Sequence, residues 1–548
     1  MTSTRSGYFP GYRFASASAI AAACLFVLLA TYRIRFPGLY YDEVIFVNAA
    51  QGGPSDNFVI NLGSVPLFVM PYLGALKAWL YAPIFSLFGV SVLTIRLPAV
   101  LLAAVTLLIF YHAMRGTLGP LWASAVVWIM AIDPLNLFTS RLDWGPTVLM
   151  HLFQAAIIAL WFSYREKPKL WKLAIIVICF GLGSFDKFNF VWFGLAFSIG
   201  TFVCYRDSVK DVLASLPRYV PWFVAILVAI ALGIMLYQVR QLLYSTGIGP
   251  VKVILTLLIG TMSGATIAEF VFESHAGIIS FAPVLLILVD GFLALTCLAL
   301  PSSNAQAREN RKNGFFFLII GFLIFAQIVI TPHAGGPHHY AMIFPWPLLA
   351  FAFLAKSAYT HIAKKNLRLL AALLLACMAI CLFCVNAHNT AVVLNHFRTN
   401  QHYNPRWSPA IYSLSRYINE HGYEASRILS LDWGLNNQLR ALAPKKLQER
   451  MRDNWGLFRK IDKKTVAEQS ARVDWVFPEG KSFVLTFAES KETFPETRRN
   501  FLAAAAFYPQ LKSRLMKEFW FGGEKTYELY EVVRQPAIQP TASEGTRD

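Results

Sequence analysis

Two adjacent carboxylates, Asp42 and Glu43, follow the first long apolar run of the chain, in the stretch GLYYDEVIFVNAA. Ionised carboxylates are costly in or near membrane hydrocarbon, so a pair at the end of a span needs a structural or functional reason. If DEVIFVNAA begins a helix, successive side chains point about 100° apart around its axis. One carboxylate could then aim at a substrate and take a proton from a reacting hydroxyl, while the other caps the helix or orients a neighbour.

More ionisable side chains recur at the same edge of later apolar runs. Asp143 lies in AIDPLNLFTSRLDWGP, between two such runs. The cations near this edge are Lys77, Arg141, Lys187 and Arg240. Loops far apart in sequence thus bring acids and bases to one membrane surface, which indicates a site there rather than a path through the membrane. Alternatively, the cations reach to lipid headgroups or pair with nearby aspartates.

Later segments add imidazole and further carboxylates. His338 and His339 follow two glycines and precede Tyr340. Imidazole could bind phosphate or, together with a carboxylate, a divalent ion such as Mg²⁺ or Mn²⁺. Candidate ligands for such an ion are Asp42, Asp143 and His338. Candidate contacts to an acceptor or a sugar are Tyr41, Glu269, Glu273 and Tyr340, although the two glutamates, one helical turn apart, also fit a solvated helix face.

The composition is that of a membrane protein, since 56% of the 548 residues are hydrophobic and only 15% are charged. This balance excludes an ordinary soluble protein. The net charge of +18 fits basic cytoplasmic loops and contact with anionic lipid better than it fits nucleic acid. The sequence predicts a polytopic α-helical protein with about eleven spans, near residues 14–32, 95–113, 119–134, 147–163, 171–185, 188–205, 219–237, 277–300, 314–332, 341–356 and 367–387.

Lysine and arginine decide the predicted orientation. Four short basic loops face the cytoplasm if the N-terminus does, at residues 165–172, 205–210, 307–312 and 361–368. The segments 33–94, 238–276 and everything after 388 then lie on the outer side. In a bacterium this would be the periplasmic side of the inner (plasma) membrane.

The composition changes near residue 388, where the chain becomes charged. Strand-like runs such as RILSLDW, FVLTF and TYELYEVV alternate there with two helical patterns, SPAIYSLSRYINEHG and TRRNFLAAAAFYPQLKSRLMKEF. This alternation predicts a small α/β domain. The expected domains are a membrane domain at 1–387, a periplasmic α/β domain at 388–535 and a disordered tail at 536–548.

The ordered set of motifs resembles the polytopic glycosyltransferases of the GT-C class, specifically the protein O-mannosyltransferase and aminoarabinose-transferase group. The similarity rests on YYDEVIFVNAA, on YLGALKAWLYAPIFSLFGVSVLTIRLPAV, on AIDPLNLFTSRLDWGPTVL and on GLGSFDKFNFVWF, within about the first 200 residues. The later TPHAGGPHHYAMIFPWP resembles the group's Tyr/Pro-rich loop more weakly. The phosphate-contacting basic residues of the group have no one-to-one match in this chain.

The resemblance implies a GT-C-like membrane domain whose first outer loop, 33–94, carries the acidic motif, and a sugar donor linked through phosphate to a polyprenol. Asp42 matches the first-loop acid and is the candidate general base, with Glu43 and Asp143 as the other candidate catalytic acids. Single displacement would invert the anomeric carbon. The departing phosphate needs positive charge, for which the candidates are Lys77, Arg141, Lys187, Arg240, His338 and His339. The outer acids and histidines permit a divalent ion, whereas the resembling families work without one, so metal dependence stays open.

Two other functions remain possible on the sequence alone. A proton- or sodium-coupled secondary transporter would use the outer carboxylates, with Asp290 near the middle of a span as its best residue. An assembly or ligase factor would bind a cell-envelope partner through its tail and use its acids structurally. The crowding of acids at one surface favours the enzyme over the transporter, and its acceptor could be a protein, a lipid or a polysaccharide.

Overall fold

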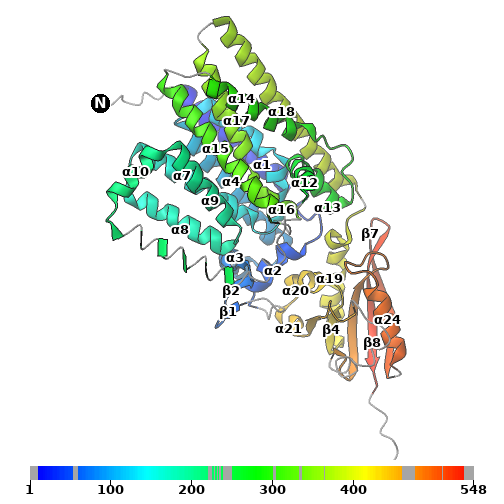
Figure 1. Ribbon diagram of the computed structural model, residues 1–548. Helices are drawn as coiled ribbons and strands as arrows, with labels where there is room; N and C mark the ends of the chain where they lie inside the picture. The colour runs from blue at the N-terminus through cyan, green and yellow to red at the C-terminus, as the bar shows by residue number, and fades with distance from the viewer. Residues whose placement is uncertain are drawn as a thin grey trace, which may run out of the picture. The chain divides into compact units, whose positions relative to one another are not determined.

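The computed structural model describes residues 10–52, 60–219, 250–299, 304–331, 336–362, 365–400, 402–458, 476–508 and 510–535, with scattered positions between 222 and 237. The chain forms two compact units (Figure 1). The helical unit consists of Met1–Ile34 and Phe58–Thr399, and the sheet unit of Arg35–Asn57 and Asn400–Asp548. Part of the predicted first outer loop therefore groups with the C-terminal part of the chain.

Helices, most of them apolar, make up most of the helical unit. They are α1 (Pro10–Thr31), α3 (Leu76–Phe88), α4 (Val92–Arg115), α5 (Pro120–Ala131), α6 (Pro134–Leu142), α7 (Thr147–Glu166), α8 (Leu170–Asp186), α9 (Phe190–Cys204), α10 (Arg206–Ser215), α12 (Val251–Ser263), α13 (Ala265–Phe272), α14 (Phe281–Ala299), α15 (Ala305–Val329), α16 (Pro337–Tyr340), α17 (Trp346–His361) and α18 (Lys365–Thr399). A small antiparallel sheet of β1 (Ile60–Leu62), β2 (Val65–Met70) and β3 (Leu73–Gly74) precedes α3. Large apolar side chains such as Leu288, Phe322 and Leu374 are exposed on the helices, as expected for a surface that faces lipid.

Seven of the described helical segments are long and apolar enough to cross a membrane, or nine if each of two bent pairs counts as one span. The pairs are α5 with α6, bent by 58°, and α12 with α13, bent by 87°. The predicted polytopic α-helical architecture is confirmed, and the described residues contain seven to nine such spans where the sequence predicted eleven for the whole chain. The predicted spans 171–185 and 188–205 form α8 and α9, which have 17 and 15 residues and are not among the seven long segments. The predicted span 219–237 lies mostly outside the described residues.

The predicted outer segment 238–276 contains helices rather than an extended loop. The sequence from 251 to 272 is largely apolar, so α12 and α13 together are apolar enough for a broken span or a re-entrant loop. Gly264 separates the two helices with φ at 85°, a left-handed conformation that glycine adopts without steric cost. The glycine makes the sharp bend possible and also interrupts the apolar pattern, which is why the sequence favoured a loop.

Two contacts join segments of the helical unit that are far apart in the sequence. At one end Arg165 pairs with Glu309 at 2.8 Å, which joins two of the basic loops. Elsewhere Arg33, just after α1, donates hydrogen bonds to the carbonyl oxygens of Phe397 and Arg398, at the end of α18, both at 3.4 Å. The ends of α1 and α18 therefore lie side by side, and the first outer loop and the C-terminal part of the chain leave the helical unit on the same side.

The sheet unit is an α/β fold around five strands in the order β5-β4-β6-β8-β7. Its elements are α2 (Tyr41–Ala50), α19 (Ala410–His421), β4 (Arg427–Ser430), α20 (Leu435–Leu442), α21 (Lys445–Gln448), β5 (Met451–Asp453), β6 (Gly480–Phe487), α24 (Thr497–Phe507), β7 (Leu511–Phe521) and β8 (Glu524–Arg534). β5, β4 and β6 run parallel, whereas β8 is antiparallel to β6 and to β7. The α/β class predicted for this part of the chain is confirmed.

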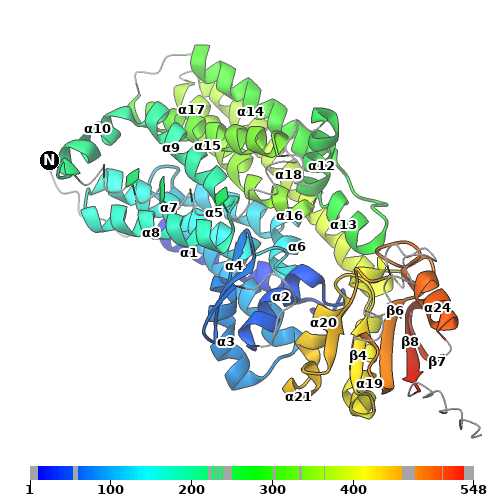
Figure 2. The ribbon, with the colours of Figure 1, turned by 60° about the horizontal axis from the view of Figure 1, so that its bottom comes forward.

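Helices cover both faces of this sheet (Figure 2). Because side chains alternate along a strand, Phe483 and Leu485 of β6 face one core with α19 and α20, and Val484 faces a second core with α24. The hydrophobic effect at these two cores holds the layers together.

Two boundaries differ from the sequence prediction. The predicted helical pattern after residue 496 is helical only as far as α24, and its second half forms β7, which pairs along its length with β8. Pro509 disfavours a helical conformation of the preceding residue, which ends the helix. The expected domain boundary at 388 falls inside α18, since the polar composition there marks the end of the apolar run rather than of the helix.

Glu528 of β8 is a fully buried carboxylate with three partners. Its carboxylate contacts Arg498 Nε at 2.5 Å and Lys525 Nζ at 2.8 Å, and it accepts a hydrogen bond from the Tyr530 hydroxyl at 2.5 Å. Burial acts to raise the pKa of Glu528, but these three partners outweigh it and lower the pKa below its ordinary value. The ionised form is therefore the one that stabilises the fold.

Replacing Glu528 by Gln should lower the free energy of unfolding by about 3 kcal/mol, because Arg498 loses its buried counter-charge. Thermal unfolding of the full chain at neutral pH measures this. The stability difference between wild type and variant should shrink as the pH falls. Below about pH 4.3 the carboxylate is protonated in the unfolded chain, and at a lower pH it is protonated in the folded protein too, because the fold lowers its pKa. Glu496→Gln, which removes an exposed pair with Arg499, is the matched control and should change stability by less than about 0.5 kcal/mol. Equal losses in both variants would contradict the assignment.

Candidate functional site

The acidic pair begins α2 in the sheet unit, and its two carboxylates differ in their surroundings. Glu43 is 1% exposed, and its Oε2 accepts a hydrogen bond from the Tyr40 backbone N–H at 3.3 Å. Glu43 thus has the helix-capping position that the sequence allowed for one member of the pair. Asp42 is partly exposed, so it is the carboxylate of the pair that a substrate can reach.

The acidic strap, defined as residues 35–52, is bound to the rest of the sheet unit along its length. The ring of Tyr40 stacks on Trp407 with centroids 4.1 Å apart and planes 10° apart. The Gly38 N–H donates to the carbonyl oxygen of Trp407 at 2.7 Å, and any Cβ at position 38 would overlap the carbonyl of Ser408. Only glycine therefore permits this close approach of the two backbones.

α20 holds the second half of the strap, beside α2 (Figure 2). Asn48 Nδ2 donates to the backbone oxygen of Asn437 at 3.1 Å and to its Oδ1 at 3.2 Å. Gln51 Nε2 donates to the carbonyl oxygen of Ala441 at 3.3 Å. Residues almost 400 positions further along the chain thus fix the helix that carries Asp42.

The carboxyl end of β4 supplies the residues next to α2. The ring of Trp433 lies 4.4 Å from that of Tyr41. Asp432 accepts hydrogen bonds from the N–H groups of Trp433 at 2.7 Å and Thr493 at 2.9 Å, and burial raises the pKa of Asp432 to about 6. Ligand sites in α/β folds commonly lie outside the carboxyl ends of parallel strands. Asp42 therefore stands beside the edge of the sheet where a ligand is expected.

Arg406 is a cation close to the acidic pair that the sequence analysis missed. Burial and the charge of Asp42 raise the pKa of Tyr40, whereas Arg406 lowers it, so both charges act on the Tyr40 hydroxyl. The tyrosine therefore stays neutral and can donate a hydrogen bond. No local spacing links Arg406 to Asp42, because their proximity arises only when the strap docks.

A second cluster is buried within the helical unit. Lys77, near the start of α3, forms a salt bridge with Asp143, and the two side chains are 2% and 6% exposed. Asp143 ends α6 with φ at 41°, a left-handed conformation that aspartate tolerates better than most residues. Its Oδ1 also accepts a hydrogen bond from the Val148 N–H, in the first turn of α7, at 3.4 Å. The ends of two helices thus fix this carboxylate.

Other predicted residues join this cluster through the two residues that follow Asp143. Lys187 Nζ donates to the carbonyl oxygen of Gly145 at 2.8 Å. The ring of His338 stacks on Trp144, with centroids 5.4 Å apart. The structure therefore brings together predicted residues from four separate loops: Lys77, Asp143, Lys187, His338 and His339.

The remaining predicted residues have other surroundings. Arg141 is fully buried and donates to the carbonyl oxygens of Tyr32 at 2.5 Å and Arg33 at 2.6 Å, so it satisfies the end of α1. Glu269 pairs with His275 at 2.7 Å through exposed side chains. The others are Glu273, which ends α13, Tyr340, which is buried in α16, and Arg240, which lies outside the described residues.

The structure gives no support for a divalent ion held by the candidate ligands Asp42, Asp143 and His338. Within the described part of the chain, no three His, Cys, Asp or Glu side chains are grouped so that they could hold a metal ion. Asp143 already binds the ammonium of Lys77, which would repel a divalent cation. The helical cluster therefore does not fit Mg²⁺ or Mn²⁺. Metal dependence of the reaction, which the sequence left open, stays open.

Lys77→Met and Asp143→Leu should each lower the free energy of unfolding by about 3–5 kcal/mol, because each leaves one buried charge without its partner. The double variant should lose clearly less than the sum of the two, because it leaves neither charge behind. Thermal unfolding of the full chain in detergent gives all three values. Additive losses would mean that the two side chains do not interact.

Trp407→Ala should loosen the acidic strap without loosening the membrane helices. Loss of the stacked ring should lower the free energy of local opening of the strap by about 3 kcal/mol. Amide exchange in residues 35–52 should therefore be roughly 100-fold faster. Hydrogen exchange with mass spectrometry of the full chain measures it, and exchange in α4 should stay unchanged. Trp171→Ala, which removes an exposed ring, is the control. Strap exchange that is the same in both variants would contradict the role of the stack.

Comparison with known proteins bears on the family and the fold of the chain. Residues 74–234 match the family described as dolichyl-phosphate-mannose-protein mannosyltransferase. No curated protein sequence matches the chain significantly. ArnT from Cupriavidus metallidurans in the apo state is similar in structure, with a TM-score of 0.55 and 13% identity over 94% of this chain and 98% of that chain.

The structure of the same ArnT bound to undecaprenyl phosphate gives a TM-score of 0.52 at 13% identity, over 93% of this chain and 97% of that chain. At this identity the similarity concerns the fold. It agrees with the family match and with the resemblance seen in the sequence. The chain thus has the fold of the polytopic GT-C glycosyltransferases.

Proposed function

We propose that this protein transfers a sugar from a polyprenyl-phosphate-linked donor to a hydroxyl group at the outer surface of the membrane. The observation that carries the proposal is the similarity of nearly the whole chain to ArnT, which has been solved with undecaprenyl phosphate bound. The match of residues 74–234 to a mannosyltransferase family supports the same reaction class. The sugar is a hexose or a pentose, and the acceptor is a protein, a lipid or a polysaccharide.

Asp42 is the proposed general base. It takes the proton of the acceptor hydroxyl as the oxygen attacks the anomeric carbon. The bond from that carbon to the phosphate oxygen breaks, and its electron pair leaves with the polyprenyl phosphate. The new bond forms on the opposite side of the sugar, so the anomeric configuration inverts. Partial exposure of Asp42 and docking of its helix by α20 support this role.

Lys187 is a candidate for holding the donor phosphate. It lies in the same buried cluster as the salt bridge between Lys77 and Asp143, and its Nζ donates to the carbonyl oxygen of Gly145. Positive charge held at this place would stabilise the departing phosphate. His338 lies next to the same backbone and can add a hydrogen bond.

The proposed location is the inner membrane, with the N-terminus in the cytoplasm and the sheet unit in the periplasm. The contact of Arg33 with the end of α18 supports the exit of the first outer loop and of the C-terminal part on one side. The pairing of basic loops through Arg165 and Glu309 supports a separate basic surface.

Asp290 favours a second candidate function, a secondary transporter. This residue of α14 is 2% exposed and lines an apolar cavity of about 260 Å³. Ionisable residues inside a span often mark an ion path. A transporter would need Asp290 for ion movement, whereas Asp290 has no part in the proposed transfer reaction.

Asp42→Asn should lower the transfer of labelled sugar from a polyprenyl-phosphate donor by at least about 100-fold, because the amide cannot accept the proton. The purified full chain is assayed with donor and a mixture of envelope acceptors, with unfolding temperature as a check on folding. Asp290→Asn is the control and should retain transfer. A D42N variant within tenfold of wild type would exclude Asp42 as the base, and loss of ion flux in vesicles only in D290N would favour the transporter.

A further inference from the structure

The cavity that Asp290 lines is enclosed within the helical unit, between α12, α14, α15 and the start of α17. Its volume is about 260 Å³. Each of the other residues in its described lining is apolar or a glycine. A cavity of about 150 Å³ with a similar apolar lining binds benzene, so this larger one can take an apolar body of roughly ten carbon atoms.

Asp290 has no protein partner that could compensate its charge. It is the tenth of the 19 residues of α14, so it lies near the middle of this candidate span. Its side chain is buried, and its Oδ1 accepts no hydrogen bond from any described residue. No basic side chain in the described part of the chain pairs with it. A carboxylate at this depth is costly without a partner, and a partner can reach it through the cavity.

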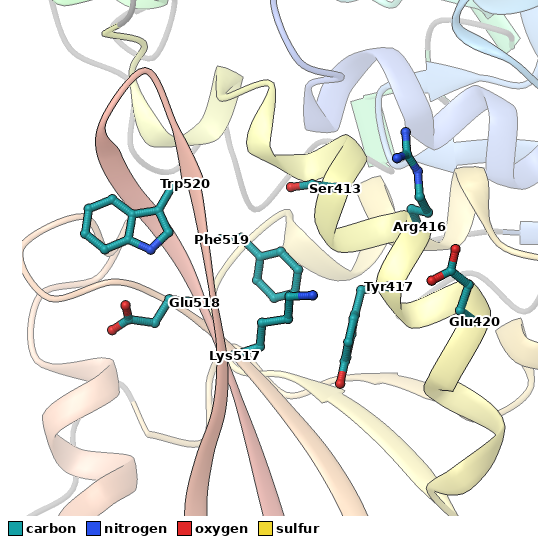
Figure 3. A pocket seen from close by; sticks show the side chains of 8 residues that line it. All are labelled: Ser413, Arg416, Tyr417, Glu420, Lys517, Glu518, Phe519 and Trp520. Atoms are coloured by element: carbon teal, nitrogen blue, oxygen red, sulfur yellow. The ribbon is translucent and has the colours of Figure 1, made fainter.

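The charge of this cavity has one sign, unlike that of the pocket on the sheet unit between α19 and β7 (Figure 3). In that pocket Glu420 and Glu518 supply two negative charges. Arg416 and Lys517 supply two positive charges, and their side chains point apart. Such a lining does not define the charge of a ligand. In the described lining of the helical cavity Asp290 is the ionisable residue, so a complementary ligand is a cation.

An organic amine suits this lining better than a metal ion does. Hard cations such as Mg²⁺ and Ca²⁺ take about six or more oxygen ligands, whereas the described side chains of the lining offer the two oxygens of Asp290. An amine needs one counter-charge and brings an apolar body, which the rest of the lining accommodates. The pair of an ammonium and a carboxylate has no net charge, and this lowers the cost of holding either ion at this depth.

The cavity reaches the surface of the helices that faces lipid. Its lining includes Leu255, Ile287 and Phe322, and each of these side chains is also exposed. Exposed apolar side chains in the middle of membrane helices contact hydrocarbon and not water. A ligand therefore enters from the lipid and must itself be lipophilic.

From these observations we propose that the cavity binds a lipophilic amine. The ammonium group pairs with Asp290, and the apolar body of roughly ten carbon atoms packs against the side chains of α12 and α15. The proposal is independent of the transfer reaction, because binding is measured without turnover and Asp290 has no part in that reaction.

Equilibrium binding to the full chain in phosphatidylcholine nanodiscs tests this. The probes are tritiated aminoadamantane, a compact hydrocarbon with one amino group, and tritiated adamantane, which lacks the amino group. Protein-free nanodiscs correct for partition into the lipid. The wild type should bind aminoadamantane at least about 30-fold more tightly than adamantane, because the charge pair with Asp290 adds to burial of the hydrocarbon. Asp290→Asn should remove this difference and leave the binding of adamantane unchanged.

Two further variants separate the cavity from other sources of binding. Leu258→Trp adds volume at a buried lining position and should abolish the binding of both probes, with the unfolding temperature as a check on folding. Asp207→Asn, which removes an exposed carboxylate of α10, is the matched control and should bind like the wild type.

Three results would overturn the proposal. Equal binding of aminoadamantane by the wild type and D290N would mean that the cavity takes only the hydrocarbon of a lipid. A loss in D207N as large as that in D290N would mean that overall charge accounts for binding. Unchanged binding in a folded L258W variant would place the probe outside this cavity.

Discussion

The docking of the acidic strap on the sheet unit is the constraint on which the proposed chemistry depends. α2 is a short helix of ten residues, and an isolated helix of this length is marginal in water. The stack of Tyr40 on Trp407 and the bonds between Asn48 and Asn437 supply the missing stability. A general base must be held in position to act, so the C-terminal part of the chain is a support for the proposed base rather than an accessory domain.

Burial of charge gives the cations of the helical unit different roles. A buried charge requires a partner, and the partner determines what the charge can still do. Arg141 is committed to the carbonyl groups at the end of α1, and Lys77 to the carboxylate of Asp143. Lys187 donates to the carbonyl oxygen of Gly145. Residue type alone made these three cations equivalent candidates, and only their partners separate them.

Much of the fold was predictable because long apolar runs must become helices in a membrane. The parts that were not predictable depend on contacts between distant residues. The bend at Gly264 was read as a loop, and β7 was read as a helix because its sequence suits both and its pairing with β8 decides. The same holds for the site: Asp42 and Asp143 were visible at span ends, whereas Arg406 and Trp433 approach α2 only through docking.

The tripeptide Asp-Trp-Gly occurs twice, at 143–145 and at 432–434, and both copies combine a bound carboxylate, a ring contact and a glycine with positive φ. In the first copy the carboxylate binds Lys77, and in the second it accepts two backbone N–H groups. These carboxylates are thus already engaged, as is Glu43 at the start of α2. An acid that must take a proton from a substrate needs access to that substrate as well as a fixed position. Asp42 is partly exposed on a docked helix, whereas the other three acids, Glu43, Asp143 and Asp432, are buried. The assignment of the base therefore depends on the surroundings of the residue and not on its motif.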